Sequence, residues 1–251
     1  MALAACELGS AMPNTGFYDW TKRALGPFWG FLSAWWWTLA TLVDTSLYVV
    51  LAANYLQGYV GFNQNLFYFA CWLVIGAFAV INILGLRLVA LSSVIFSIPI
   101  ISPFLVLIIV GLANWQFNPF HPIVPPGQNL MGGDGALILG LSVGLWMYSG
   151  YESLSTLSGE MSNSERVIPK ALMLALPFVA LMYVLPTLAS LAAFGQWDRF
   201  GVAGTGDSVS FIDIGRSLGG TALGHALLAS ALLGNLALYL DYMGSCARPL
   251  Y

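Results

Sequence analysis

The sequence predicts an all-α integral membrane protein, because it has too few charges for a soluble domain and its apolar residues form runs of membrane-crossing length. Of the 251 residues, 59% are hydrophobic and only 8% are charged, whereas a soluble domain carries about 25% charged residues. So small a charged fraction cannot solvate a globular surface, and the apolar excess must face lipid. The net charge of −3 gives no indication of a nucleic-acid partner, and we expect none.

Apolar residues gather in one short segment and six long ones. The short segment, Met1 to about Leu8, cannot cross a bilayer, whereas each long segment has about 20 residues or more, which is the length that crossing requires. Backbone polar groups in lipid must be bonded within the protein, so continuous runs of this length predict helices. The expected spans are roughly residues 27–57, 65–84, 87–113, 135–161, 168–194 and 222–247.

Basic residues are divided unevenly between the linkers. Alternate linkers lie on the same side of a membrane, and one set contains only Arg199 and Arg216. The other set is expected in the cytoplasm, because cytoplasmic loops are enriched in Lys and Arg; it contains Lys22, Arg23, Arg87, Arg166, Lys170 and Arg248. Residues 1–8 are then the end of a helix that enters the cytoplasm. We therefore interpret residues 1–251 as one incomplete membrane domain from the middle of a longer chain.

Two linkers have the composition of short helices. The segment NTGFYDWTKRALGP, before the first span, mixes apolar and charged residues as a short amphipathic helix does. The stretch SFIDIGRSL, within the polar linker 195–221, is consistent with a surface helix. The linker ILGLRL, which contains Arg87, is short enough for a tight turn.

Three acidic residues fall inside the expected spans. Asp44 and Glu152 lie near the middle of theirs, and Asp241 lies about seven residues from the cytoplasmic end of the last span. Every Lys and Arg falls in a linker or at a helix end, so none neutralises these acids at mid-membrane. Each acid must therefore be protonated, reach water or meet a cation from outside the protein. A proton or a cationic ligand meets that need, and a protonated acid that bonds a neighbouring helix is the structural alternative.

The segment GLWMYSGYESLSTLSGE combines glycine with polar residues at mid-membrane depth. Gly150 weakens a helix locally and lies close to Glu152. Hydroxyl side chains that include Ser149 recur at helical spacing, and such a stripe lines either a cavity or a packed helix interface. The glycine beside an acid is more informative, because broken helices in membranes bind ligands through their freed backbone groups. We predict non-helical backbone near Tyr148–Gly150.

Aromatic residues accompany both features. Trp146 and Tyr148 precede the glycine, and Asn235, Tyr239 and Tyr242 share one face of the last expected span. Aromatic faces attract cations, although ordinary packing explains most aromatic residues in the chain. Asp241 lies about 160° around the helix from Tyr239, so the two are not expected to touch one ligand.

Signatures of soluble enzymes and of metal sites are absent from the sequence. There is no GxGxxG, GxxxxGK[ST], HExxH or paired CxxC motif. The histidines, His121 and His225, lie in or near linkers without a metal-site partner in sequence, and the three cysteines give no disulfide framework. We expect no enzyme activity, no cofactor and no bound metal.

Three blocks of this sequence resemble the amino acid–polyamine–organocation transporter superfamily. ELGSAMPNTGFYDWTKRALGPFWGF is similar to the end of its second helix, the following loop and the start of its third helix. NILGLRL resembles the turn between helices four and five, and GYESLSTLSGEMSNSERVIPKAL resembles helix six and the loop into helix seven. The resemblance extends from late helix two through helix eight. It implies part of a five-plus-five inverted-repeat fold with a broken sixth helix, without helix one and without helix nine onward.

The resemblance also implies roles for residues of this chain. By this resemblance, backbone carbonyls near Trp146 and Ser149 accept hydrogen bonds from a substrate amine, and the Trp146 ring covers the substrate chain. Glu152 matches an acid implicated in gating and proton response, and Tyr239 matches an aromatic residue that borders the substrate. The predicted substrate site, with Glu152 also in proton coupling, comprises Asp44, Trp146, Tyr148, Ser149, Gly150, Glu152, Asn235 and Tyr239.

A closer subgroup is indicated by TLVDTSLYVVLAANYLQ, which resembles helix three of plant and protozoan polyamine transporters with an acid at Asp44. The resemblance implies a multi-pass protein of the cell membrane that imports polyamines or cationic amino acids, coupled to protons. Its partners are then the substrate, the proton and the bilayer. Two alternatives stay open: a general or neutral amino acid permease, and a truncated fragment that does not transport.

Overall fold

The computed structural model describes residues 2–12, 15–84, 86–121, 129–131, 136–150, 163–195 and 209–246. Regular structure within these ranges is helical, and no β-strand is found in them. The prediction of an all-α integral membrane protein is confirmed. Five of the helices are long and apolar enough to cross a membrane. They are α3 (Pro27–Val60), α4 (Gln64–Ile83), α5 (Leu86–Ala113), α8 (Ser164–Phe194) and α9 (Phe211–Cys246).

The shorter helices are α1 (Ala2–Ala11), α2 (Phe17–Leu25) and α6 (Ala136–Met147). Helix α2 is the amphipathic helix expected before the first span, with Lys22 and Arg23 in its last turn. Helix α6 occupies the start of the expected span 135–161 and is apolar but too short to cross a bilayer by itself. Residues 151–162, the remainder of that expected span, lie outside the described residues.

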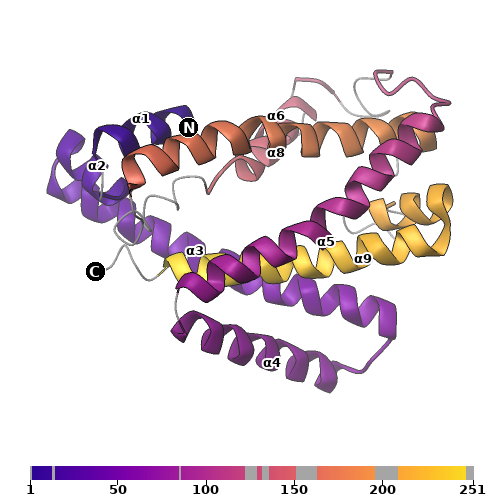
Figure 1. Ribbon diagram of the computed structural model, residues 1–251, viewed down its shortest axis with the longest axis horizontal. Coiled ribbons are helices and arrows are strands. Elements are labelled where there is room, and N and C mark those ends of the chain that lie inside the picture. Colours follow the sequence, from indigo (N-terminus) through magenta and orange to yellow (C-terminus); the bar gives the residue numbers. More distant parts are fainter. Residues whose placement is uncertain are drawn as a thin grey trace. The chain divides into compact units, whose positions relative to one another are not determined.

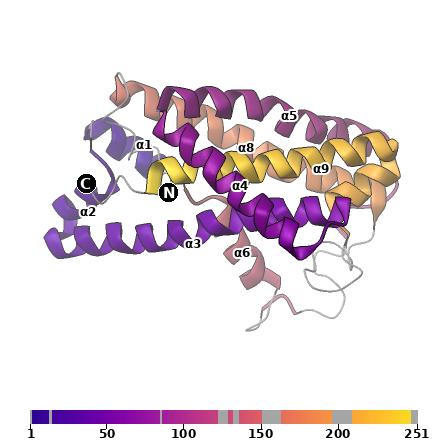
Figure 2. The ribbon, with the colours of Figure 1, turned by 90° about the horizontal axis from the view of Figure 1, so that it is seen from below.

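A glycine turn folds α2 back along α3, as Figure 2 shows. Gly26 has φ 98°, a conformation that glycine adopts without steric cost, and Pro27 follows as the first residue of α3. Helix α3 then approaches α2 so closely at Gly30 that a Cβ there would lie 2.8 Å from the Cβ of Lys22. This close approach keeps α2 against the start of the first long helix.

Helices α3 and α4 form a hairpin (Figure 1). Helix α3 ends at Gly61 in the left-handed conformation, with φ 75° and its N–H bonded to the carbonyl of Gln57. Asn63 begins α4, because its side chain accepts a hydrogen bond of 3.0 Å from the backbone N–H of Leu66. Two local capping signals thus position α4 beside α3.

The long helix α9 contains a sharp bend at Gly220, which has φ 74°. The part before the bend starts at Phe211 and contains the short helix expected at SFIDIGRSL. The bend forms a tight helical hairpin, in which a Cβ on Gly215 would lie 2.3 Å from a side-chain carbon of Leu227. Glycines at this interface let the two arms approach closely, as small residues do between membrane helices.

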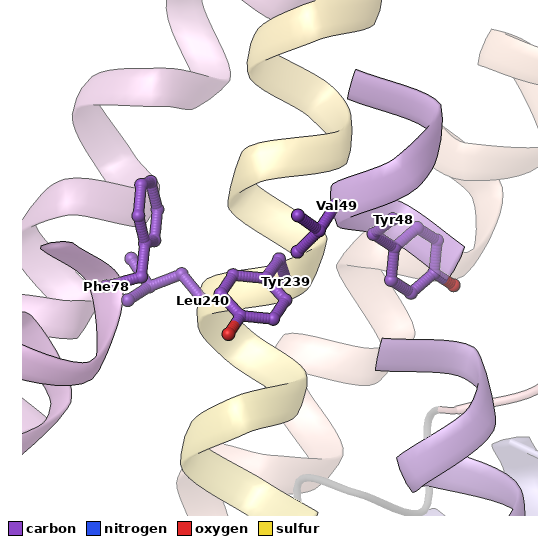
Figure 3. Packing of buried hydrophobic residues seen from close by; sticks show 5 residues of the cluster. All are labelled: Tyr48, Val49, Phe78, Tyr239 and Leu240. Carbon is purple, nitrogen blue, oxygen red and sulfur yellow. The ribbon is translucent and has the colours of Figure 1, made fainter. Parts of the chain in front are cut away.

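The chain divides into two compact units. Unit 1 comprises Met1–Ile100, Gly150–Ala175 and Ala229–Tyr251, and unit 2 comprises Ile101–Ser149 and Leu176–Leu228. Unit 1 contains a buried cluster in which Tyr239 of α9 lies between Phe78 of α4 and Val49 of α3 (Figure 3). In unit 2 the α9 hairpin packs through Ile214 and Leu227 on Leu107 of α5.

Candidate substrate-binding site

Helix α6 ends where the sequence predicts a break. Its last residue is Met147, Ser149 and Gly150 are not helical, and Gly150 has φ 97°. The prediction of non-helical backbone near Tyr148–Gly150 is therefore confirmed. A side chain at Gly150 would be strained in this conformation whatever space surrounds it, because L residues rarely adopt such a φ.

The carbonyls freed at the end of α6 have partners within unit 2. The carbonyl of Trp146 accepts from the Ser149 hydroxyl at 2.7 Å and from the Ser149 backbone N–H at 3.1 Å. The Met147 carbonyl accepts from the Tyr183 hydroxyl of α8 at 3.3 Å. The Tyr183 ring also meets that of Tyr148 edge to face, with 5.5 Å between the centroids. A helix end of this kind stays ordered in lipid because its polar groups are satisfied.

Asp44, the expected acid of α3, lies in unit 1 and is partly exposed. The hydroxyl of Tyr48, one helical turn further along α3, donates to Asp44 Oδ2 at 3.0 Å. Tyr48 itself is buried, only 6% exposed. The hydroxyl is a neutral donor, so Asp44 has no positively charged partner in this contact.

The ring of Tyr48 stacks on a second tyrosine. Tyr242, near the end of α9, has its ring centroid 5.6 Å from that of Tyr48, with 29° between the planes. The Tyr242 hydroxyl lies 2.9 Å from the position that a Cβ on Gly150 would occupy. Unit 1 therefore contains a continuous line of contacts from Asp44 through Tyr48 and Tyr242 to Gly150.

Two other predicted site residues of unit 1 lie on α9. Tyr239 is 5% exposed and meets the ring of Phe78 edge to face, with 5.9 Å between the centroids. The side chain of Asn235 is partly buried and donates to the Ala231 carbonyl of its own helix at 2.8 Å. Tyr239 thus takes part in the packed core around Tyr48 and Val49, which is the role that ordinary packing predicts.

Asp241, the third acid within an expected span, contacts α5 and not the aromatic cluster around Tyr239. The Ser93 hydroxyl of α5 donates to Asp241 Oδ1 at 2.8 Å. This contact ties α9 to α5, whereas Tyr239 packs on α4. Asp241 and Tyr239 therefore contact different helices, as their separation around α9 predicts.

The predicted site residues divide between the two units. Asp44, Gly150, Asn235 and Tyr239 belong to unit 1, and the others that are described belong to unit 2: Trp146, Tyr148 and Ser149. The Trp146 side chain is 57% exposed. Glu152, predicted for both binding and proton coupling, lies outside the described residues.

Three residues that the predicted site omitted take part in these contacts: Tyr48, Tyr183 and Tyr242. The pairing of Asp44 with Tyr48 was visible in the sequence, because residues four apart lie on one helical face. Tyr242 shares a face with Tyr239 by the same rule, but its contact with Gly150 depends on tertiary structure. The part of the chain that the structure describes contains no group of three or more His, Cys, Asp or Glu able to hold a metal ion.

A family model described as amino acid permease matches residues 1–243 of the chain. The chain belongs to the amino acid permease family. Membership agrees with the five helices of membrane-crossing length, and together they indicate a multi-pass integral membrane protein.

Several named transporters and an exchanger are similar to this chain over nearly all of its length. The polyamine transporter RMV1 of Arabidopsis thaliana is 30% identical over 247 residues, which cover 97% of this chain and 48% of the relative. The polyamine transporter PUT1 of Oryza sativa subsp. japonica is 31% identical over 262 residues, with 97% and 44% covered. The serine/threonine exchanger SteT of Bacillus subtilis (strain 168) is 27% identical over 237 residues, with 91% and 51% covered. The chain thus spans about half the length of these relatives.

Proposed function

We propose that the native full-length protein is a secondary active transporter that imports polyamines, coupled to protons, across the cell membrane. The observation that carries this proposal is Asp44, a partly exposed carboxylate inside a membrane span whose hydrogen bond comes from a neutral tyrosine. A carboxylate in lipid that keeps its charge needs a cation. The similarity to two plant polyamine transporters supports the choice of cation.

Polyamines suit this site because they carry two or more positive charges and no carboxylate. One ammonium group bonds Asp44, and Glu152 provides the second acid of the pathway. A charge-assisted hydrogen bond of this kind contributes about 1.5–3 kcal/mol. In the same proposal, Glu152 binds the coupled proton, and an arriving ammonium group displaces it.

The second candidate is a permease for general or neutral amino acids, which the similarity to a serine/threonine exchanger favours. An amino acid also presents an amine, which fits Asp44, but its carboxylate needs hydrogen-bond donors. The end of α6 offers carbonyls rather than donors to a ligand, and two of these carbonyls, those of Trp146 and Met147, already accept bonds. The polyamine proposal therefore fits the described residues better, because a polyamine has no carboxylate that needs hydrogen-bond donors.

Competition uptake separates the two candidates. The native full-length protein is expressed in cells that lack endogenous polyamine uptake, and labelled putrescine uptake is measured against unlabelled spermidine, arginine and leucine. The polyamine proposal expects strong inhibition by spermidine, weaker inhibition by arginine and none by leucine. Inhibition by leucine as strong as that by spermidine would replace it with the general amino acid permease.

A further inference from the structure

The contacts between Asp44 and Gly150 pass through two tyrosines whose rings stack. Tyr48 donates its hydroxyl to Asp44 at 3.0 Å, and its ring is 5.6 Å from that of Tyr242. A tyrosine side chain has two rotatable torsions with several allowed rotamers, so its hydroxyl donates steadily to one acceptor only when the ring is held in one of them. The stack holds the buried ring of Tyr48 on one face, and Val49 and Tyr239 belong to the same cluster.

The Tyr242 hydroxyl occupies space that is open because Gly150 has no side chain. Its hydroxyl lies 2.9 Å from the ideal Cβ position there, and its Cζ atom lies 3.9 Å away. Real Cβ atoms essentially never approach another atom as closely as the first distance, whereas the second is ordinary van der Waals contact. A methyl group at position 150 would therefore displace the Tyr242 hydroxyl but would tolerate the ring.

We propose that Tyr242 is a positioning residue for Asp44. Its hydroxyl occupies the space beside Gly150, its ring supports that of Tyr48, and Tyr48 then directs a hydrogen bond to the Asp44 carboxylate. The backbone at Gly150 and the acid of α3 are thereby linked, so that a change at one alters the other. The inference rests on the proposed function where it makes Asp44 the acid that attracts the substrate.

The link to Gly150 is tested by a double-mutant cycle that needs no transport assay. Gly150→Ala, Tyr242→Phe and the double variant are made in the native full-length protein, and thermal unfolding midpoints are measured in detergent. Gly150→Ala alone suffers both the strain at φ 97° and the contact with the hydroxyl. Because Tyr242→Phe removes the contacting oxygen, Gly150→Ala should lower the midpoint by a clearly smaller amount in the Tyr242→Phe background.

Gly26 supplies a matched control for this cycle. It has φ 98°, nearly the same as Gly150, but nothing lies within 4 Å of its Cβ position. Gly26→Ala should therefore lower the midpoint equally with and without the Tyr242 hydroxyl. If Gly150→Ala behaves as Gly26→Ala does, with strictly additive shifts, the contact between Tyr242 and position 150 has no energetic content and the inference is overturned.

The link to Asp44 is tested by transport kinetics. Tyr242→Leu removes the ring that supports Tyr48, and Tyr242→Phe keeps it. Tyr242→Leu should raise the KM for putrescine by about tenfold, which corresponds to roughly 1.4 kcal/mol, whereas Tyr242→Phe should have a smaller effect. In an Asp44→Asn background Tyr242→Leu should have no further effect on KM, because it acts through the carboxylate.

The outcomes distinguish this inference from the proposed function. A full effect of Tyr242→Leu on KM in the Asp44→Asn background means that Tyr242 does not act through Asp44, and this inference alone is overturned. If Asp44→Asn alone leaves the KM for putrescine unchanged, the proposed role of Asp44 is overturned. The inference that Tyr242 positions Asp44 for the substrate is then overturned as well. In either case, the thermal unfolding midpoints decide separately whether Tyr242 and position 150 are energetically coupled.

Discussion

Two acids in the membrane spans of unit 1, Asp44 and Asp241, both accept a hydrogen bond from a neutral hydroxyl, but the donors differ in kind. Asp44 receives its bond from Tyr48 of the same helix, and Tyr48 is stacked on a further tyrosine that contacts Gly150. Asp241 receives its bond from Ser93 of another helix, α5. The first arrangement joins an acid to the non-helical backbone at Gly150, and the second joins two helices.

The comparison teaches that an acid within a membrane span is not by itself evidence for a ligand. A carboxyl group bonded across helices is explained by packing, because the bond satisfies both polar groups in lipid. A carboxyl group whose donor belongs to its own helix contributes no such tie between helices. We therefore propose that Asp44 attracts a cation and that Asp241 has a structural role, and the following predictions separate the two residues.

The largest effect is expected from Gly150→Leu. A leucine cannot adopt φ 97° without strain, and its side chain would displace Tyr242. We expect loss of putrescine binding with nearly normal membrane insertion, measured as labelled putrescine bound and normalised to surface expression. Gly140→Leu is the matched control, because nothing lies within 4 Å of its Cβ position and it sits inside α6. Putrescine binding by Gly150→Leu as strong as that by Gly140→Leu and by the unaltered protein would show that the non-helical backbone at Gly150 has no role in binding.

Glu152→Gln should change the pH dependence of uptake rather than its maximum. Glutamine keeps the shape of the side chain but cannot bind or release a proton. We expect the initial rate of putrescine uptake to vary less between about pH 5 and 8 than it does in the unaltered protein, because an essential acid or base gives a rate its pH dependence. A pH profile identical to that of the unaltered protein would remove Glu152 from proton coupling.

Ser93→Ala should have the smallest effect on transport. It removes the donor to Asp241 and the tie between α5 and α9, so it should lower the free energy of unfolding by about 0.5–1.5 kcal/mol, the net contribution of a typical hydrogen bond. The KM for putrescine should stay within about twofold, well below the tenfold change that corresponds to about 1.4 kcal/mol. The reason is that Asp241 has a structural role in this account and does not contact the substrate. A large rise in KM with unchanged stability would move Asp241 into the substrate pathway.

Much of the fold was predictable from the sequence, because the length of an apolar run is a local property. Helices α3, α4, α5 and α8 each lie within a few residues of an expected span, and the apolar run that predicts the last span forms the second arm of α9. The end of α6 before Gly150 was also predictable, since glycine lowers helix stability locally. Helix α2 was predictable because its amphipathic composition is likewise a local property of the sequence.

The candidate site was predictable only in part, because its contacts join residues that are distant in sequence. The bond from Ser93 to Asp241 and the approach of Tyr242 to Gly150 depend on how helices pack. The partner of Asp44 lies four residues away and was accessible to helical geometry, yet aromatic residues are so frequent in this chain that Tyr48 did not stand out. Packing in membranes is driven by shape, which composition does not encode.

Putrescine binding to Asp44→Asn and Asp241→Asn variants of the purified full-length protein tests the central claim most directly. Titration calorimetry should show that Asp44→Asn weakens binding by about tenfold to a hundredfold, the equivalent of the 1.5–3 kcal/mol of a charge-assisted hydrogen bond. Asp241→Asn, which keeps an oxygen for Ser93 to bond, should leave the affinity within about twofold. Unchanged affinity in Asp44→Asn, or an equal loss in both variants, would contradict the account.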